Sequence, residues 1–151
     1  MKEGNFVIRV YGIFLNEKNQ VLLTDEFQVG IKMTKFPGGG LQFGEGTVNC
    51  LKREMKEECK GQQIKNIRHF YTTDFYQEAL FYENHQLISI YYLAELEKPI
   101  QFKISEIPFN FEKMENGSQS FRWEDVNLLK EDDISFPIDK FVLRKLKSKI
   151  Q

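Results

Sequence analysis

Apolar and β-branched residues recur along the chain in short runs that polar turns separate. The first run, residues 5–16, is rich in valine, isoleucine and phenylalanine, which are typical of strands. The polar turn Asn16-Glu17-Lys18-Asn19 then leads into a second run. The same criteria, applied to the whole chain, predict strands over residues 5–16, 20–27, 31–36, 64–75, 86–96 and 120–123.

Two other segments repeat their apolar residues at helical spacing. In residues 46–60 the apolar positions step by three and four, which places on one helix face Val48, Leu51, Met55 and Cys59. This apolar stripe must pack against a sheet. The second helix begins near Pro137, with Ser135 as its expected N-cap. Its apolar face consists of Ile138, Phe141, Val142, Leu146 and Ile150.

The order of these elements predicts an α/β fold. Strands precede and follow one amphipathic helix, and a second helix ends the chain, so we expect helical layers over a mixed sheet. The chain has 151 residues, of which 41% are hydrophobic, enough for one domain with a core. We therefore expect a single domain over residues 1–151. Residues 98–120 contain prolines and the pair Asn116-Gly117, which indicate a loop.

The central helix also carries a cluster of acidic residues. Glu54, Glu57 and Glu58 lie at i, i+3 and i+4, so their carboxylates share one helix face, mostly off the apolar stripe. Like charges at this spacing destabilise an isolated helix by roughly 0.2–0.5 kcal/mol per pair. Such a group of oxygen ligands suits a divalent cation such as Mg²⁺. Because lysines and an arginine alternate with the glutamates, a solvated charged face is the alternative.

The spacing of glycine and charged residues around this helix is more specific. Residues 36–61 read FPGGGLQFGEGTVNCLKREMKEECKG, and their three successive glycines allow a sharp turn or a close approach to a ligand. Gly39 is followed by five residues and Glu45, then by seven residues and Arg53-Glu54-Met55-Lys56-Glu57-Glu58. This resembles the signature of the Nudix hydrolase family (MutT-like), G-x5-E-x7-R-E-U-x-E-E-x-G-U, with U aliphatic. Lys60 occupies the last glycine position, so we expect Gly61 to take the left-handed conformation at the helix end.

The resemblance implies an α/β/α sandwich and gives the matching residues their roles. The implied catalytic residues are Glu45, Arg53, Glu54 and Glu57, and the implied ligands of Mg²⁺ or Mn²⁺ are Gly39, Glu54, Glu57 and Glu58. Gly39 would bind through its carbonyl oxygen. Glu54 would be a ligand, the general base, or both. Glu45 and Arg53 correspond to the family's structural salt bridge, which ties the loop to the helix.

The resemblance also implies a reaction. Nudix enzymes typically hydrolyse a nucleoside diphosphate linked to another moiety. We therefore expect a Mg²⁺-dependent pyrophosphohydrolase in which water attacks phosphorus in such a compound or in a nucleoside triphosphate. A further acidic ligand is expected from a later loop, with Glu112 and Glu115 as candidates. The alternative is a non-catalytic module of the same fold that binds a nucleotide or sugar nucleotide, although such modules usually lose motif carboxylates that this chain keeps.

The sequence narrows the substrate only in part. Glu26 stands where the coenzyme A subgroup has an arginine after Leu-Leu-Thr. There is no proline between Pro37 and Pro99, where the ADP-ribose subgroup carries one. Tyr76 lies near the tyrosine that marks dinucleoside polyphosphate enzymes, but it is predicted to be a strand residue. Dinucleoside polyphosphates and modified nucleoside triphosphates therefore both stay open.

Charge and cysteine content limit the partners and the compartment. The formal net charge of −1 argues against binding a nucleic-acid polymer, so the expected partner is a small nucleotide. No apolar run approaches membrane-spanning length, and the charged start MKEGN is unlike a signal peptide. Cys50 and Cys59 lie too far apart on one helix to bridge. We expect reduced thiols and a cytoplasmic location, and a homodimer stays open.

Four further polar residues are weaker candidates for a functional role. Lys32 and Lys35 lie on opposite faces of the strand 31–36, and we expect surface lysines, with phosphate contact as the alternative. His69 and His85 are the only histidines. Neither has a partner at ligand or triad spacing, so neither is expected to be catalytic.

Overall fold

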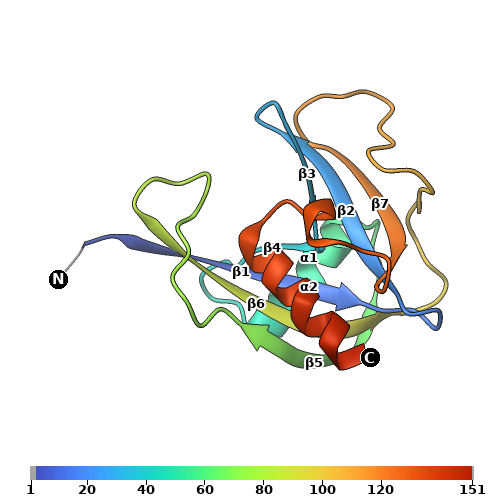
Figure 1. The fold of residues 1–151 in the computed structure, drawn as a ribbon, viewed down its shortest axis with the longest axis horizontal. Helices are drawn as coiled ribbons and strands as arrows, with labels where there is room; N and C mark the ends of the chain where they lie inside the picture. Colours follow the sequence, from blue (N-terminus) through green and yellow to red (C-terminus); the bar gives the residue numbers. More distant parts are fainter. Residues whose placement is uncertain (1–2, 151) are drawn as a thin grey trace.

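The computed structural model describes residues 3–150, and it folds into two β-sheets and two α-helices (Figure 1). The sheet with strand order β4-β1-β6-β5 is mixed, and the sheet with strand order β3-β2-β7 is antiparallel. Along the chain, the elements are β1 (Asn5–Phe14), β2 (Gln20–Gln28), β3 (Ile31–Lys35), β4 (Gly38–Gly40), α1 (Thr47–Glu58), β5 (Ile64–Thr72), β6 (His85–Leu96), β7 (Ser118–Asp125), the 3₁₀-helix η1 (Glu131–Asp133) and α2 (Pro137–Ile150).

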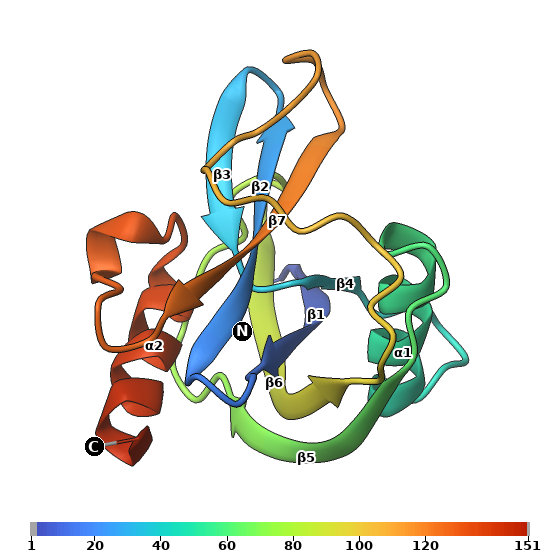
Figure 2. The ribbon, with the colours of Figure 1, turned by 90° about the vertical axis from the view of Figure 1, so that its right-hand side faces the viewer.

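The mixed sheet lies between the two helices, α1 on one side and α2 on the other (Figure 2). Its centre is the parallel pair of β1 and β6, which runs from Asn5 opposite His85 to Phe14 opposite Ala94. Its other strand pairs are antiparallel. The predicted α/β class with a mixed sheet between helical layers is therefore confirmed.

Alternation along the central strand divides the core into two clusters. Successive side chains of a strand point to opposite faces of the sheet. Tyr11 and Ile13 accordingly pack with apolar residues of α2, whereas Val10 and Phe14 pack with apolar residues of α1. The α2 residues in the first cluster are Ile138, Val142, Leu143 and Leu146, and the α1 residues in the second are Cys50, Leu51 and Met55, followed by Cys59 just past the helix end. Both faces of the sheet are thus covered.

The glycines before α1 form a strand rather than a sharp turn. Gly38–Gly40 is the edge strand β4, in which Gly39 pairs with Val10 and Gly40 with Arg9 of β1. The absence of side chains lets β4 lie very close to its neighbours. A Cβ on Gly38, for example, would lie 2.0 Å from the carbonyl oxygen of Val10.

The end of α1 differs in part from the predicted helix exit. The helix ends at Glu58 with Cys59 as its C-cap, and the next residue, Lys60, has a φ of 51°. Gly61 has a φ of 83°, and its N–H donates to the Lys56 carbonyl at 2.9 Å, as in a Schellman motif. Gly61 is left-handed, as predicted. The prediction that it takes this role in place of Lys60 is wrong, because Lys60 directly follows the C-cap and adopts the left-handed conformation as well.

Several element boundaries and one predicted helix cap also differ from the structure. β5 ends at Thr72, so Tyr76 is an exposed loop residue and not a strand residue. β7 is longer than predicted, because Ser118–Asp125 pairs with β2 along its whole length. The Ser135 hydroxyl accepts a hydrogen bond from the Thr34 backbone N–H at 2.8 Å, so it ties β3 to the segment before α2 instead of capping that helix.

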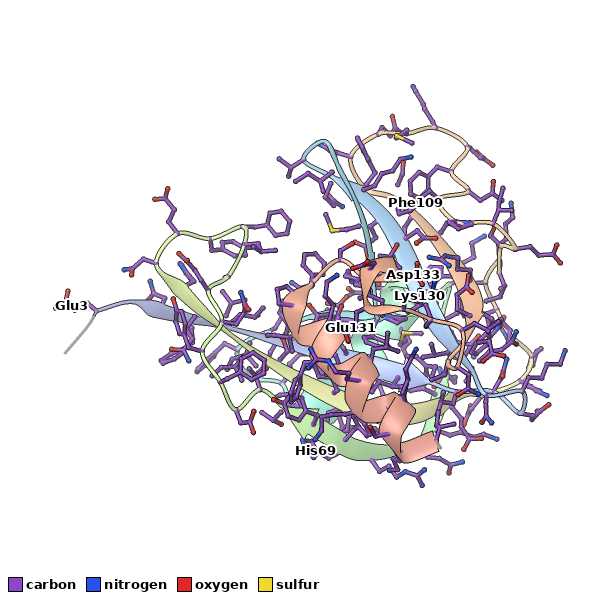
Figure 3. The ribbon with its side chains drawn as sticks, viewed as in Figure 1. Glu3, His69, Phe109, Lys130, Glu131 and Asp133 are labelled. Atoms are coloured by element: carbon purple, nitrogen blue, oxygen red, sulfur yellow. The ribbon has the colours of Figure 1, made fainter. Side chains whose placement is uncertain are left out.

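His69 and the two cysteines show no feature of a catalytic group. His69 lies on β5, near the bottom of Figure 3, whereas Phe109 lies near its top. The His69 ring contacts the Thr72 hydroxyl at 2.8 Å. Both cysteines are free and buried, and burial raises the pKa of each thiol to about 12. Within residues 3–150, no helix has the length and apolar character needed to cross a membrane.

Replacing Lys60 by glycine should stabilise the protein. A side chain in the left-handed conformation costs roughly 1–2 kcal/mol, which glycine does not incur. We expect Lys60→Gly to raise the free energy of unfolding by about 1 kcal/mol in a denaturant titration. Gly61→Ala is the matched control, and it should lower stability because Gly61 shares this conformation. An unchanged or lower stability of Lys60→Gly would contradict the assignment of strain to this position.

Candidate active site

Arg53 of α1 joins three segments of the chain. Its Nε donates to Oε2 of Glu45 at 3.0 Å, and its Nη2 donates to Oε1 of the same carboxylate at 2.7 Å. Nη2 also donates to the carbonyl oxygen of Gly40 at 3.0 Å. The guanidinium therefore holds the loop before α1 and the edge strand β4 against the helix, and the bidentate pair with Glu45 is the geometry that arginine favours.

The same guanidinium also contacts two of the three clustered glutamates. Nη1 of Arg53 donates to Oε1 of Glu54 at 3.0 Å and to Oε2 of Glu57 at 3.2 Å. The Glu54 side chain is 13% exposed and the Glu57 side chain is 58% exposed. Arg53 thus offsets the repulsion between two carboxylates that share one helix face.

Gly39 leaves room for the carboxylate of Glu54. A Cβ built on Gly39 would lie 2.4 Å from the Cδ and Oε1 atoms of Glu54, which is far inside van der Waals contact. Any residue larger than glycine would therefore displace this carboxylate or the strand β4. The first glycine of the motif is needed for packing against the helix.

Glu58 faces a different group of side chains. The Gln119 amide, on β7, donates to Oε2 of Glu58 at 3.3 Å and to Oε2 of Glu26 at 3.4 Å. It also donates to the Thr24 hydroxyl at 3.0 Å. Glu26 lies opposite Gln119 in the pairing of β2 with β7. Two residues absent from the sequence motif, Glu26 and Gln119, are therefore neighbours of the acidic helix face.

Lys35 is buried beside this group, so the prediction of a surface lysine is wrong. It is 5% exposed, and its Nζ lies 3.0 Å from Oε2 of Glu26. The ammonium group is also 5.5 Å from the centre of the Tyr11 ring, a cation–π distance. The alternation of β3 had suggested only that Lys32 and Lys35 lie on opposite faces. Glu26 on β2 makes the burial of the Lys35 charge tolerable. Nothing in the sequence indicated that these two residues would pair.

Burial and like charges act together on Glu58. Burial raises the pKa of its carboxyl group to about 7, Lys35 opposes this effect, and the negative charges of Glu26 and Glu54 add to it. An added positive charge at this point would therefore favour the ionised carboxylate.

The clustered carboxylates do not form a closed ligand set. Within residues 3–150, no three His, Cys, Asp or Glu side chains converge as metal ligands would. Glu54 and Glu57 are turned toward Arg53, and Glu58 toward Gln119. The residue types nevertheless fit a hard divalent cation, because such ions take carboxylate and carbonyl oxygens.

Glu112 and Glu115 lie elsewhere. Both are exposed in the loop before β7, and Glu115 pairs with Lys113 at 3.8 Å. Among the described contacts, neither reaches the carboxylates of α1. The later segment does reach the site, but through Gln119 of β7, which no sequence signal distinguished from the other residues of the predicted loop 98–120.

A cavity of about 350 Å³ adjoins this group of charges. Glu26, Lys35 and Arg9 line it on the side of β1, β2 and β3, and Asp139 lines it at the start of α2. Other parts of the wall come from the loop 77–82 and from aromatic residues of the sheet and of the segment before α2, among them Tyr11, Tyr91 and Phe136.

The family model described as NUDIX domain matches residues 5–144, nearly the whole chain. The chain belongs to the Nudix family. The match includes the motif and both helices up to residue 144 of α2, as the resemblance of the motif implied.

Individual relatives agree with this family. An RNA pyrophosphohydrolase of Bartonella bacilliformis is 27% identical over an alignment of 104 residues, and the match covers 64% of this chain and 59% of that protein. A MutT structure from work on Aliivibrio salmonicida and Vibrio cholerae is 17% identical, with a TM-score of 0.63 over 96% of this chain and 99% of that one. A Nudix hydrolase from Nitrosomonas europaea is 15% identical, with a TM-score of 0.70 over 97% and 90%. At these identities the two structures establish the fold alone.

Removing Arg53 should weaken both the fold and the site. Arg53→Ala would leave Glu45, Glu54 and Glu57 without their shared cation, so we expect a lower melting temperature. Lys52→Ala is the matched control, since Lys52 is exposed on the same helix and has no ion pair in the described part of the chain. Its effect should stay within about 0.5 kcal/mol. Equal unfolding curves for the two variants would show that Arg53 is an ordinary surface charge.

The Arg53–Glu45 pair should also make the free energy of unfolding depend on pH in the acid range. Hydrogen bonds from Arg53, and then from the Gln42 backbone, lower the pKa of Glu45 to about 2. Its stabilising effect is therefore complete above the unfolded pKa of about 4.5 and is lost as the pH falls through about 2. Glu45→Gln should reduce the loss of stability across this window. If wild type and variant lose stability in parallel, the pair contributes nothing to acid unfolding.

Proposed function

We propose that this protein is a pyrophosphohydrolase dependent on Mg²⁺ or Mn²⁺, acting as one domain over residues 1–151. Its substrate is a nucleoside diphosphate linked to another moiety, or a nucleoside triphosphate, and water attacks at phosphorus. The observation that carries the proposal is the complete set of motif carboxylates on α1, which the Gln119 amide connects, through Glu58 and Glu26, to a cavity lined by Arg9 and Lys35. These two cations complement a polyphosphate, and membership of the Nudix family supports the reaction class.

Each residue of the site has a role in this proposal. Glu57 and Glu58, with Glu54 and the Gly39 carbonyl, would hold the divalent cation. When bound, the cation would neutralise phosphoryl oxygens and make a water molecule more acidic. Glu54, as ligand or general base, is close enough to Arg53 for its orientation to be set by that contact. Arg53 keeps Glu54 and Glu57 on the same side of α1, and Glu45 in turn orients Arg53.

The range of candidate substrates is set by the name of a relative and by the net charge of the chain. The name of the Bartonella relative adds RNA to the candidate substrates, and in RNA the matching linkage is a 5′-terminal triphosphate. The formal net charge of −1 favours a small nucleotide over a polymer.

A cytoplasmic location is proposed because both cysteines are free. A non-catalytic nucleotide-binding module would keep binding but show no turnover.

Neutralising the carboxylates should abolish turnover without unfolding the protein. Glu57→Gln and Glu58→Gln each keep the side-chain size and remove a charged ligand, so we expect turnover to fall about a hundredfold or more. Binding of Mg²⁺ in a calorimetric titration should weaken in parallel. Glu97→Gln, on an exposed residue outside the site, is the control and should keep full activity. The assay uses Mg²⁺ with nucleoside triphosphates, nucleoside diphosphate derivatives and RNA carrying a 5′-triphosphate.

Hydrolysis in ¹⁸O-labelled water identifies the atom that is attacked. Attack at phosphorus places the label on a phosphate-bearing product. Label found only on a carbon-bound oxygen, or full activity of the Glu57 and Glu58 variants, would rule out the proposed mechanism. In that case the acidic face of α1 would be only a solvated surface.

A further inference from the structure

Phe43 is the most exposed of the large apolar side chains in residues 3–150. Its relative exposure is 109%, whereas that of the next most exposed, Leu128, is 75%. Single exposed apolar side chains are common on protein surfaces, although each gives up the free energy that burial would provide. What distinguishes Phe43 is its position, because it lies in the motif loop between the strand β4 and Glu45.

The turn that carries Phe43 is fixed to the helix. The Glu45 N–H donates to the Gln42 carbonyl at 3.2 Å. Gly44 has a φ of 96°, so these four residues form a type II turn with Phe43 at its second position. The Gln42 N–H donates in turn to Oε1 of Glu45 at 2.9 Å. Because Arg53 holds that same carboxylate, a backbone anchored to α1 presents the Phe43 ring to solvent.

One end of the acidic face of α1 adjoins the cavity. Oε2 of Glu58 accepts a hydrogen bond from the Gln119 amide, which also donates to Glu26 in the cavity wall. The cations Lys35 and Arg9 line that wall as well. Phosphates bound to these two cations and to a divalent ion at Glu58 would therefore lie at this end of the acidic face.

The other end of the acidic face adjoins Phe43. Arg53 lies five residues before Glu58, which is about 7.5 Å along the helix axis. Its guanidinium contacts both Glu57 and Glu45. Phe43 lies two residues before Glu45, so their Cα atoms are at most about 7 Å apart. A phosphate chain that runs from the cavity along the acidic face therefore ends close to the exposed ring.

A flat ring with both of its faces in solvent suits a nucleobase. Bases stack on exposed aromatic side chains, and the contact tolerates any base because every base has a π-face. A nucleoside triphosphate has only one base. A dinucleoside polyphosphate has a second base, and so does RNA with a 5′-triphosphate, in the nucleotide that follows the first.

We propose that Phe43 stacks on a second nucleobase of the substrate, which therefore contains two nucleosides joined through phosphate. The inference rests on the proposed function, of which it narrows the substrate class. The second base comes either from a dinucleoside polyphosphate or from the 5′ end of RNA. A nucleoside triphosphate is the poorer substrate, because it leaves Phe43 without a partner.

Kinetics with matched substrates test the contact. ATP, diadenosine tetraphosphate and the RNA dinucleotide pppApA all carry adenine, and only the last two have a second base. We expect Phe43→Ala to lower the kcat/KM for at least one two-base substrate about tenfold relative to that for ATP. Phe43→Trp keeps a stacking ring and should rescue the ratio. Leu128→Ala removes an exposed apolar side chain elsewhere and should keep the wild-type ratio.

The two sources of the second base give different results. A loss with diadenosine tetraphosphate alone assigns the contact to dinucleoside polyphosphates, and a loss with pppApA alone assigns it to RNA. If Phe43→Ala changes neither ratio, or if Leu128→Ala lowers both equally, the proposal is overturned.

Tryptophan fluorescence decides the question if none of the three compounds is hydrolysed. Wild-type protein has one tryptophan, Trp123, and supplies the background signal. In Phe43→Trp, with Mg²⁺ present, a two-base ligand at about 1 mM should quench the added indole more strongly than ATP does. Leu128→Trp is the control and should respond alike to all three. Equal quenching of Phe43→Trp by the three ligands, or no quenching, would overturn the proposal.

These outcomes are separable from those of the proposed function. Selective quenching of Phe43→Trp by a two-base ligand, with no turnover of any nucleotide, would keep the inference as a binding site and remove the pyrophosphohydrolase activity. Hydrolysis of ATP and of both two-base substrates, with ratios that Phe43→Ala leaves unchanged, would do the reverse.

Discussion

The carboxylate site depends on one cation, the guanidinium of Arg53. Two hydrogen bonds hold it to Glu45, a third holds it to the Gly40 carbonyl, and its remaining nitrogen contacts Glu54 and Glu57. A single planar group therefore fixes the loop, the edge strand and the helix relative to one another. Because it also offsets the repulsion on the acidic face, the helix can present its carboxylates together while its opposite face packs on the sheet.

The second sheet positions the other half of the site through a buried ion pair. Arg122 of β7 donates to Asp25 of β2 at 2.8 Å, and the Asp25 side chain is fully buried. Asp25 also accepts a hydrogen bond from the Thr34 hydroxyl at 2.7 Å, so β2, β3 and β7 meet at one carboxylate. This buried network holds the register in which Gln119 lies opposite Glu26. Both of those side chains then reach the region of Glu58.

The two helical layers carry different chemistry, and α2 is the helix that lines the cavity. α1 carries a face of carboxylates, whereas α2 contributes a single buried carboxylate, Asp139, among aromatic side chains. Between them, the cavity presents the positive charges of Lys35 and Arg9. The cavity wall therefore carries both of these cations and also the carboxylates of Glu26 and Asp139.

The sequence alone determined both helices, the α/β class, the family and the strands other than the glycine strand β4, because these follow from local periodicity and from a motif contained in residues 39–61. It also identified Glu54, Glu57 and Glu58 as neighbours, since helical spacing is local. Only the tertiary structure showed that Lys35 is buried and that Glu26, Gln119 and Asp139 surround the same region. Those residues come from strands and a helix far apart in the chain. Their proximity depends on strand register and on the packing of two layers, and neither leaves a periodic signal in the sequence.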